Sequence, residues 1–361
     1  MAIRAVVPER VERLCDDTLD VKPLREQLLV EIRRAVPFDA HVWLLTDPVS
    51  RVGTSPLADV PGLTWSRLPH LTRQRYLSPV NRWTDLMDTG SAVASLHETT
   101  GGELAASDLW REAQRPLGVV DAATVVFWDR FGCWGWLELW RYAPAAPFTS
   151  AELGYLGALA DPVAAAVRRA QARTFVHTGM DPPDAGPEAE VGGPAVLVLA
   201  PDLQVRVQTK SAAEALHRLN PPDDSIPVIP AAAYNVAAAL VAQEHGVPLG
   251  PPCSRIHLGH GRWLTLRASR ISPTGSAEGD IAVSIAASTP SERREVFALA
   301  HGLSRRERQI LSELATGADT GALARRLVIS AHTVNDHVKA ILAKTGATTR
   351  HALLSRIAGT G

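Results

Sequence analysis

The chain has 361 residues, of which 46% are hydrophobic and 21% are charged, so it can bury more than one core. No apolar run approaches the roughly 20 residues of a membrane helix, and the first residues lack the apolar stretch of a secretion signal. The three cysteines, Cys15, Cys133 and Cys253, are odd in number and far apart, which argues against a disulfide framework. We therefore expect a cytoplasmic protein with no membrane partner.

The charge is unevenly distributed along the chain. Residues 291–361 contain 11 Lys and Arg against 6 Asp and Glu, a net charge of +5, whereas residues 1–290 contain 26 against 32, a net charge of −6. A cationic segment on an acidic body is typical of a DNA-binding module, because neutralising phosphates supplies most non-specific affinity. A solvated basic helix surface is the other interpretation.

The N-terminal region is predicted to contain an antiparallel sheet with helices. A helix is expected from about Val21 to Val36, followed by a short buried strand at 41–46. After an irregular stretch rich in tryptophan, segments 123–128 and 133–140 flank a turn and predict a hairpin.

A capping-box pattern, Thr149 to Glu152, predicts a helix that continues to about Arg173 and is kinked at Pro162. This helix is expected to pack on its own sheet and to close a first domain over residues 1–178. Residues 179–194 are rich in Pro, Gly and acidic side chains and are interpreted as a linker.

A second domain is expected over residues 195–290. Its predicted elements are, in chain order, strands at 195–199 and 205–208, a helix after Ser211, a helix at 231–244, and strands near 254–258, 262–270 and 281–287. This order predicts one antiparallel sheet with helices on a face.

The C-terminal segment is predicted to be helical throughout. A capping box at 304–307 starts one helix, and Gly317 ends it. Asp319 is expected to cap a second helix and Ser330 a third, which runs over 331–344. The second and third of these helices are therefore joined by a tight turn.

The third helix is amphipathic and is the expected recognition helix. Its inner face carries Val334, Val338, Ile341 and Leu342. The opposite face, which would enter a DNA groove, carries His332, Asn335, Asp336, Lys339 and Ala343.

This segment resembles the LuxR-type helix-turn-helix. The resemblance covers about sixty residues and rests on Leu303-Ser-x-Arg-Glu307, Ala315-Thr-Gly317, Leu323-Ala-x-x-Leu327, Ile329-Ser-x-x-Thr-Val334, His337, Ile341, Lys344 and Gly346. It implies that Thr333, His337, Lys344 and Arg350 touch or orient phosphates, and that Asn335, Asp336 and Lys339 face base edges. It also implies that the helix after Thr348 pairs two subunits into a homodimer.

Two short stretches depart from the family pattern. Thr320-Gly321-Ala322 stands where Asn-Lys-Glu or similar residues are usual, and Gly321 should loosen the first turn of its helix. Asn335-Asp336 replaces a basic and an aliphatic residue, and an Asp repels phosphate unless it accepts a hydrogen bond from cytosine.

Upstream, the helix-strand opening, the hairpin and the long closing helix resemble a GAF domain, and residues 195–289 resemble a PAS domain. The expected fold class is therefore multidomain α+β. It comprises a GAF-like antiparallel sheet with helices, a PAS-like α/β domain and an all-α helix-turn-helix domain.

Aromatic residues of the first domain are candidates for a ligand pocket. By the period of two, Trp134, Trp136 and Trp140 are expected on one face of the hairpin with Glu138 between them, although core packing also explains them. The stretch around Trp65, Tyr76 and Trp83 is similar to autoinducer-binding domains. Ser78 stands where those domains carry an Asp, which argues against an acyl-homoserine lactone ligand.

Cys253, His257 and His260 match no standard zinc spacing and are interpreted as strand and turn residues, so neither a metal nor a cofactor is expected. Phosphate-loop, H-E-x-x-H and G-x-S-x-G patterns are missing, which argues against an enzyme. A phosphorylated response regulator would need clustered acidic residues at strand ends early in the chain, and these are missing too.

The preferred hypothesis is a homodimeric transcriptional regulator that binds double-stranded DNA and responds to a small-molecule effector. A ligand-free dimerisation and interaction scaffold with a DNA-binding tail remains the alternative.

Overall fold

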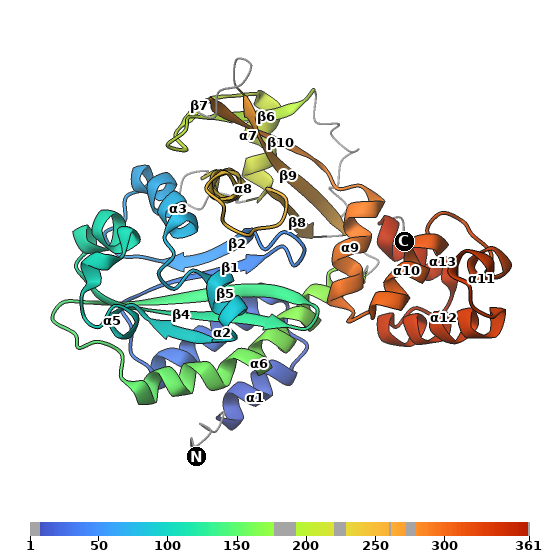
Figure 1. The fold of residues 1–361 in the computed structure, drawn as a ribbon, viewed down its shortest axis with the longest axis horizontal. Coiled ribbons are helices and arrows are strands. Elements are labelled where there is room, and N and C mark those ends of the chain that lie inside the picture. The colour runs from blue at the N-terminus through green and yellow to red at the C-terminus, as the bar shows by residue number, and fades with distance from the viewer. Residues whose placement is uncertain (1–7, 177–192, 220–228, 260, 272–278, 360–361) are drawn as a thin grey trace, which may run out of the picture.

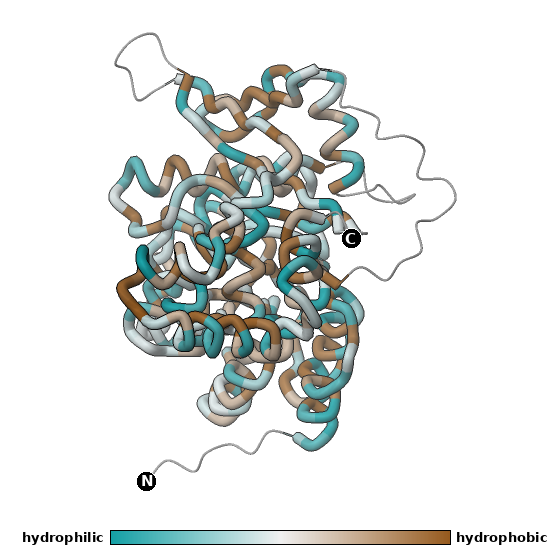
Figure 2. The backbone as a smooth tube through the Cα atoms, turned by 90° about the vertical axis from the view of Figure 1, so that its right-hand side faces the viewer, coloured by the Kyte–Doolittle hydropathy of each residue, from teal (hydrophilic) through white to brown (hydrophobic). Residues whose placement is uncertain are grey.

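A computed structural model describes residues 8–176, 193–219, 229–259, 261–271 and 279–359, which are the coloured parts of the chain in Figure 1 and Figure 2. The described residues form two antiparallel sheets and a C-terminal group of helices (Figure 1). The fold is multidomain α+β, which confirms the predicted class. Within the described residues, no helix combines the length and the apolar character needed to span a membrane.

The first sheet has the strand order β2-β1-β5-β4-β3, and all neighbouring strands are antiparallel. Its strands are β1 (Ala40–Thr46), β2 (Gly53–Asp59), β3 (Val93–Ser95), β4 (Val119–Asp129) and β5 (Gly132–Tyr142). One face is covered by α1 (Glu9–Asp16), α2 (Val21–Ala35) and α6 (Ser150–Arg173), which share a core with the sheet. The hairpin β4–β5 and the capping box of Thr149 and Glu152 are confirmed.

The opposite face of this sheet carries short helices that the sequence does not predict. They are α3 (Leu68–Leu77), α4 (Trp83–Thr89) and α5 (Leu96–Thr99), together with single turns at Trp65–Arg67, Leu104–Ala106, Trp110–Gln114 and Arg115–Leu117. Their hydrophobic periodicity is weak because each is only one to three turns long and is held by tertiary contacts. Tyr76 of α3 and Trp83 of α4 pack edge to face, with ring centroids 4.8 Å apart.

The second sheet has the order β7-β6-β10-β9-β8 and is also antiparallel throughout. Its strands are β6 (Ala195–Leu199), β7 (Val205–Gln208), β8 (Cys253–Gly259), β9 (Arg262–Ile271) and β10 (Asp280–Ala287). The two accompanying helices are α7 (Lys210–Leu219) and α8 (Ala231–Glu244). All seven elements match the predicted order.

Helix α8 joins the two sheets. It lies between them (Figure 1), and its residues share one hydrophobic core with Leu44 and Trp136 of the first sheet and Leu266 and Val283 of the second. Every residue from Ala232 to Ala239 is buried. Their mostly small side chains allow both sheets to approach the helix closely.

The C-terminal part consists of α9 (Pro290–Ala300), α10 (Arg305–Leu314), α11 (Thr320–Leu327), α12 (Ala331–Thr345) and α13 (Arg350–Ala358). The predicted caps are confirmed, since the side chains of Ser304, Asp319 and Ser330 each accept a backbone hydrogen bond at the start of a helix. Gly317 and Gly346 have φ values of 82° and 64°, which favour glycine and end the helices before them.

Helix α9 is an element that the sequence analysis does not predict. It begins with a capping box of Thr289 and Glu292. Its Phe297 lies in the core of the C-terminal helices and packs edge to face on Phe175, which itself stacks on Trp263 of β9. The C-terminal core therefore includes side chains from both preceding parts.

The predicted linker at 179–194 lies outside the described residues except for Gly193 and Pro194, and His260 lies outside them as well. Among the described residues, no group of three or more His, Cys, Asp or Glu side chains is placed to hold a metal ion.

Candidate nucleic-acid interface and ligand pocket

The outward face of α12 carries the residues that the periodicity of the sequence predicts. His332, Asn335, Asp336, Lys339 and Ala343 are exposed, whereas Val334, Val338 and Ile341 are buried against α10 and α11. In Figure 1 α12 lies at the outer edge of the C-terminal helices, away from both sheets. A polar helix face is therefore presented to solvent.

Two polar contacts shape this face. Arg350 Nη2 donates to Asn335 Oδ1 at 3.2 Å and to Thr320 Oγ1 at 3.0 Å, so it links α13 to both α12 and α11. His332 Nε2 lies 3.5 Å from Asp336 Oδ2, one helical turn away, and this offsets the acidic charge at 336 when the histidine is protonated. Asp336 is thus not an isolated carboxylate on this face.

Lys344 is exposed at the end of α12 and is paired within the domain. Its Nζ lies 2.7 Å from Glu307 Oε2, in an ion pair that ties α12 to the first turn of α10. Burial alone would raise the pKa of Glu307, but hydrogen bonds from Lys344 and Ser304 outweigh it and hold the pKa below its ordinary value. In this structure Lys344 braces the domain.

The remaining predicted residues of the interface are half-buried. Thr333 shares a hydrogen bond with the N-cap Ser330, with the two hydroxyl oxygens 2.9 Å apart, and His337 lies one turn further along α12. Sequence reasoning did not select Arg306, whose Nη2 donates to the carbonyl of Leu327 at 2.7 Å and holds the turn before α12. Its position in a helix N-terminus gives no signal of that role.

A pocket of about 360 Å³ lies between the first sheet, α3 and α8. Four of the six predicted aromatic residues line it, namely Trp65, Tyr76, Trp136 and Trp140. Ile229, Ala231 and Asn235, which belong to the region of the second sheet, close another side. The pocket is thus shared by two parts of the chain, which the sequence analysis did not foresee.

The prediction that Trp134 shares a face with Trp136 and Trp140 is wrong. The β4–β5 register shifts between Phe127 and Trp128, so Trp134 is an extra residue in a β-bulge and no longer alternates with Trp136. It lies in the core beneath α6 instead.

Trp83 does not line the pocket either. It is fully buried behind the pocket wall, stacked on Trp136 with ring centroids 5.5 Å apart.

The polar groups of the pocket are concentrated at Arg75 and Glu138. Both are buried, and Arg75 Nε lies 3.8 Å from Glu138 Oε1 while the guanidinium packs over the ring of Trp136. Tyr76 accepts a hydrogen bond from the Gly53 backbone at 2.8 Å and donates to Asn235 Oδ1 at 3.0 Å, and burial raises the pKa of its hydroxyl. The rest of the lining is mainly apolar.

Comparison with known proteins identifies the C-terminal part. Residues 301–356 match the family described as bacterial regulatory proteins, luxR family. No curated protein matches the chain.

Three solved structures give weak overall alignments. The crystal structure of Escherichia coli SdiA is 15% identical over 97% of this chain and 95% of that one, with a TM-score of 0.33. SdiA in complex with octanoyl-rac-glycerol is 15% identical over 98% and 93%, with a TM-score of 0.34. The sensor region of a sensor histidine kinase is 16% identical over 79% and 94%, with a TM-score of 0.18. The assignment rests on the family match alone: residues 301–356 form a helix-turn-helix DNA-binding domain of the luxR family.

Proposed function

We propose that this chain is a sequence-specific transcriptional regulator that places α12 in the major groove of DNA under the control of its N-terminal parts. The observation that carries the proposal is the solvent-facing polar side of α12 within a luxR-family domain. The net charge of +5 on residues 291–361 supports it, because a cationic domain is attracted to the phosphate backbone.

Within this proposal the residues of the interface divide into those that contact bases and those that contact phosphates. Asn335, Asp336 and Lys339, with His332 at the start of the helix, face base edges, while Thr333, His337, Lys344 and Arg350 touch or orient phosphates. Lys344 contributes by holding α10 against α12 through Glu307. The helix α13 pairs two copies, as the family resemblance implies.

The N-terminal parts are proposed to sense a small molecule. Residues 1–178 act as a GAF-like domain and residues 195–290 as a PAS-like domain. If the strands of each sheet are numbered from one in chain order, both sheets have the order 2-1-5-4-3. This shared topology supports a common kind of sensor. The mainly apolar pocket with a buried carboxylate and guanidinium suits an apolar molecule bearing one polar group.

Lys339→Ala tests the DNA-binding surface. It is expected to weaken binding to an operator, recovered from genomic fragments that the protein retains, by about 1–3 kcal/mol if Lys339 contacts a base in two places. Titration at fixed salt measures the effect. Lys210→Ala, which removes the same charge from the exposed start of α7, is the control and should leave the affinity unchanged. Equal affinities of all three proteins would contradict the assignment.

Ala231→Trp tests the sensing pocket. The indole would occupy the space next to α8, so the variant is expected to bind the apolar dye Nile red at least about tenfold more weakly than the unaltered protein. A fluorescence titration measures the difference, with Ala145→Trp on an exposed turn as the control. A ligand-free scaffold predicts no such difference, because no small molecule would enter the pocket in either protein.

A further inference from the structure

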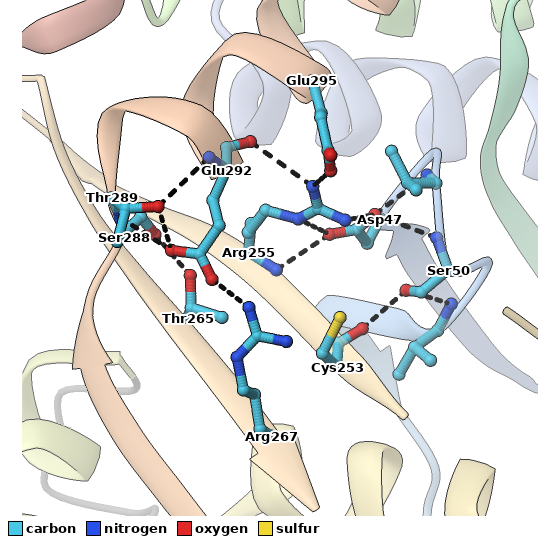
Figure 3. Close-up of polar contacts among 12 residues, drawn as sticks. Asp47, Ser50, Cys253, Arg255, Thr265, Arg267, Ser288, Thr289, Glu292 and Glu295 are labelled. Atoms are coloured by element: carbon cyan, nitrogen blue, oxygen red, sulfur yellow. Dashed lines mark hydrogen bonds and ion pairs between the residues drawn. The ribbon is translucent and has the colours of Figure 1, made fainter. Parts of the chain in front are cut away.

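A buried arginine of the second sheet is held by the first sheet. Arg255 of β8, with a side chain only 3% exposed, donates through Nε to Asp47 Oδ2 at 2.7 Å and through Nη2 to Oδ1 at 3.1 Å. Its backbone N–H donates to Oδ2 as well, at 3.0 Å. Figure 3 shows this paired contact at the centre of a junction formed by Asp47, Ser50, Cys253, Arg255, Glu292 and Glu295.

The turn that follows β1 is fixed by the same carboxylate. Asp47 Oδ1 also accepts hydrogen bonds from the backbone of Val49 at 2.9 Å and Ser50 at 3.1 Å. Ser50 Oγ in turn donates to the carbonyl of Cys253 at 2.6 Å. The turn and the start of β8 therefore behave as one unit.

The guanidinium of Arg255 also contacts α9. Arg255 Nη1 donates to Glu295 Oε2 at 2.6 Å and to the backbone carbonyl of Glu292 at 3.3 Å (Figure 3). The side chain of Glu292 also pairs with Arg267 of β9. Arg255, itself part of the second sheet, thus contacts both the turn that follows β1 and the helix that leads to the C-terminal helices.

Helix α9 is bound firmly to the C-terminal helices. Arg293 donates to the carbonyls of Ala358 and Arg356 at 3.1 and 3.2 Å, at the end of α13. Val296 and Phe297 lie in the C-terminal core. A shift of α9 would consequently carry the recognition helix with it.

The pocket and the junction share strand β1. Val42 and Leu44 line the pocket, and Asp47 follows Leu44 by three residues, about 10 Å along an extended strand. On the opposite side, α8 lines the pocket and packs on the sheet that holds Arg255. A molecule in the pocket would therefore contact β1, which leads to Asp47, and α8, which packs on the sheet that carries Arg255.

We propose that a molecule bound in this pocket changes the position of α9, and with it of the DNA-binding helices, through the contacts of Arg255. The inference rests on the function proposed above and specifies its regulation. A buried ion pair adds little net stability over apolar packing, but its fixed two-bond geometry permits only one arrangement of the groups it joins. A bound molecule that favours another arrangement of the two sheets shifts the equilibrium between two positions of α9. The size of that shift is set by the difference in the molecule's affinity for the two arrangements.

The first test removes the ion pair between Arg255 and Glu295 of α9 and leaves the hydrogen bond from Arg255 to the carbonyl of Glu292 in place. Glu295 is 55% exposed, so Glu295→Ala removes that ion pair without leaving a cavity. In the full-length protein without DNA, backbone amides of α9 are expected to exchange hydrogen for deuterium about threefold faster or more. Glu244→Ala, which breaks the Arg270–Glu244 pair within the second part, is the control. Unchanged exchange in Glu295→Ala would overturn the proposal.

The second test measures coupling with Ala231→Trp as a fixed occupant of the pocket. It is expected to change the exchange of α9 by about threefold or more in the unaltered background and by clearly less in the Glu295→Ala background, where only the hydrogen bond from Arg255 to the carbonyl of Glu292 remains. Ala58→Trp, which fills the pocket from its exposed rim, replaces it if the first variant does not fold. The same change in both backgrounds, or none in either, overturns the proposal. These measurements involve no DNA, so a failure to bind an operator would count only against the proposed function.

Discussion

Replacing Asp47 with alanine is expected to lower the free energy of unfolding of the full-length protein by about 3–5 kcal/mol. The carboxylate is fully buried and accepts five hydrogen bonds, three of them from Arg255. Its removal leaves a guanidinium without its main counter-charge, and the turn at 47–50 loses two backbone contacts. Urea unfolding followed by circular dichroism measures the loss.

Asp202→Ala is the matched control for that experiment. Asp202 also accepts a backbone hydrogen bond within a turn, from Gln204 at 3.1 Å, but it is exposed. Its loss should cost about 0.5 kcal/mol. Similar small losses in both variants would mean that water replaces Asp47 beside Arg255, and that burial of this pair is not what holds the two sheets together.

Val334→Asp is expected to unfold the C-terminal helices. Val334 is fully buried in the core with Ile310 and Leu323, and an unpaired carboxylate there should cost more than about 4 kcal/mol. Loss of helical circular dichroism signal and of hydrogen-exchange protection in α12 measures this. Asn335→Asp places the same carboxylate one residue further, on the exposed face, and should keep both signals. Retained cooperative melting of Val334→Asp would contradict the assigned core.

This experiment requires the full chain. The core around Phe297 includes Phe175 from the end of the first part and Trp263 from β9. A fragment that starts at residue 291 would lack both rings, so its stability would report a truncated core as well as the substitution.

The C-terminal helices were the most predictable part because their signals are local. A cap such as Ser304 contacts a backbone group three residues away, and Gly317 and Gly346 adopt conformations that few other residues tolerate. The inner and outer faces of α12 follow from periodicity along one helix. The strands of the second sheet were equally recognisable, because alternation and flanking turns depend on neighbouring residues only.

The rest depended on contacts between distant residues. Asp47 and Arg255 are 208 positions apart, and nothing near either residue indicates that they meet. The pocket was only half predictable for the same reason, since α8 closes it from another part of the chain. The position of Trp134 failed because a one-residue bulge reverses the facing of every side chain beyond it.

Helix α9 is a different case, because a local signal was present. Thr289 and Glu292 have the same spacing as the capping box of Ser304 and Glu307, and the structure forms both boxes. A search for that spacing along the whole chain would have found this helix.

The contact between Arg350 and Asn335 fixes the orientation of an amide on the exposed face of α12. Arginine offers only N–H donors, so the atom of Asn335 that faces it is the amide oxygen, and one of the two lone pairs of that oxygen is occupied. The two-bond pairing of asparagine with adenine needs oxygen and nitrogen together. Asn335 keeps the second lone pair of its oxygen and its two amide hydrogens for a base, so under the proposed function a residue on the neighbouring helix holds in place the amide that would contact the operator.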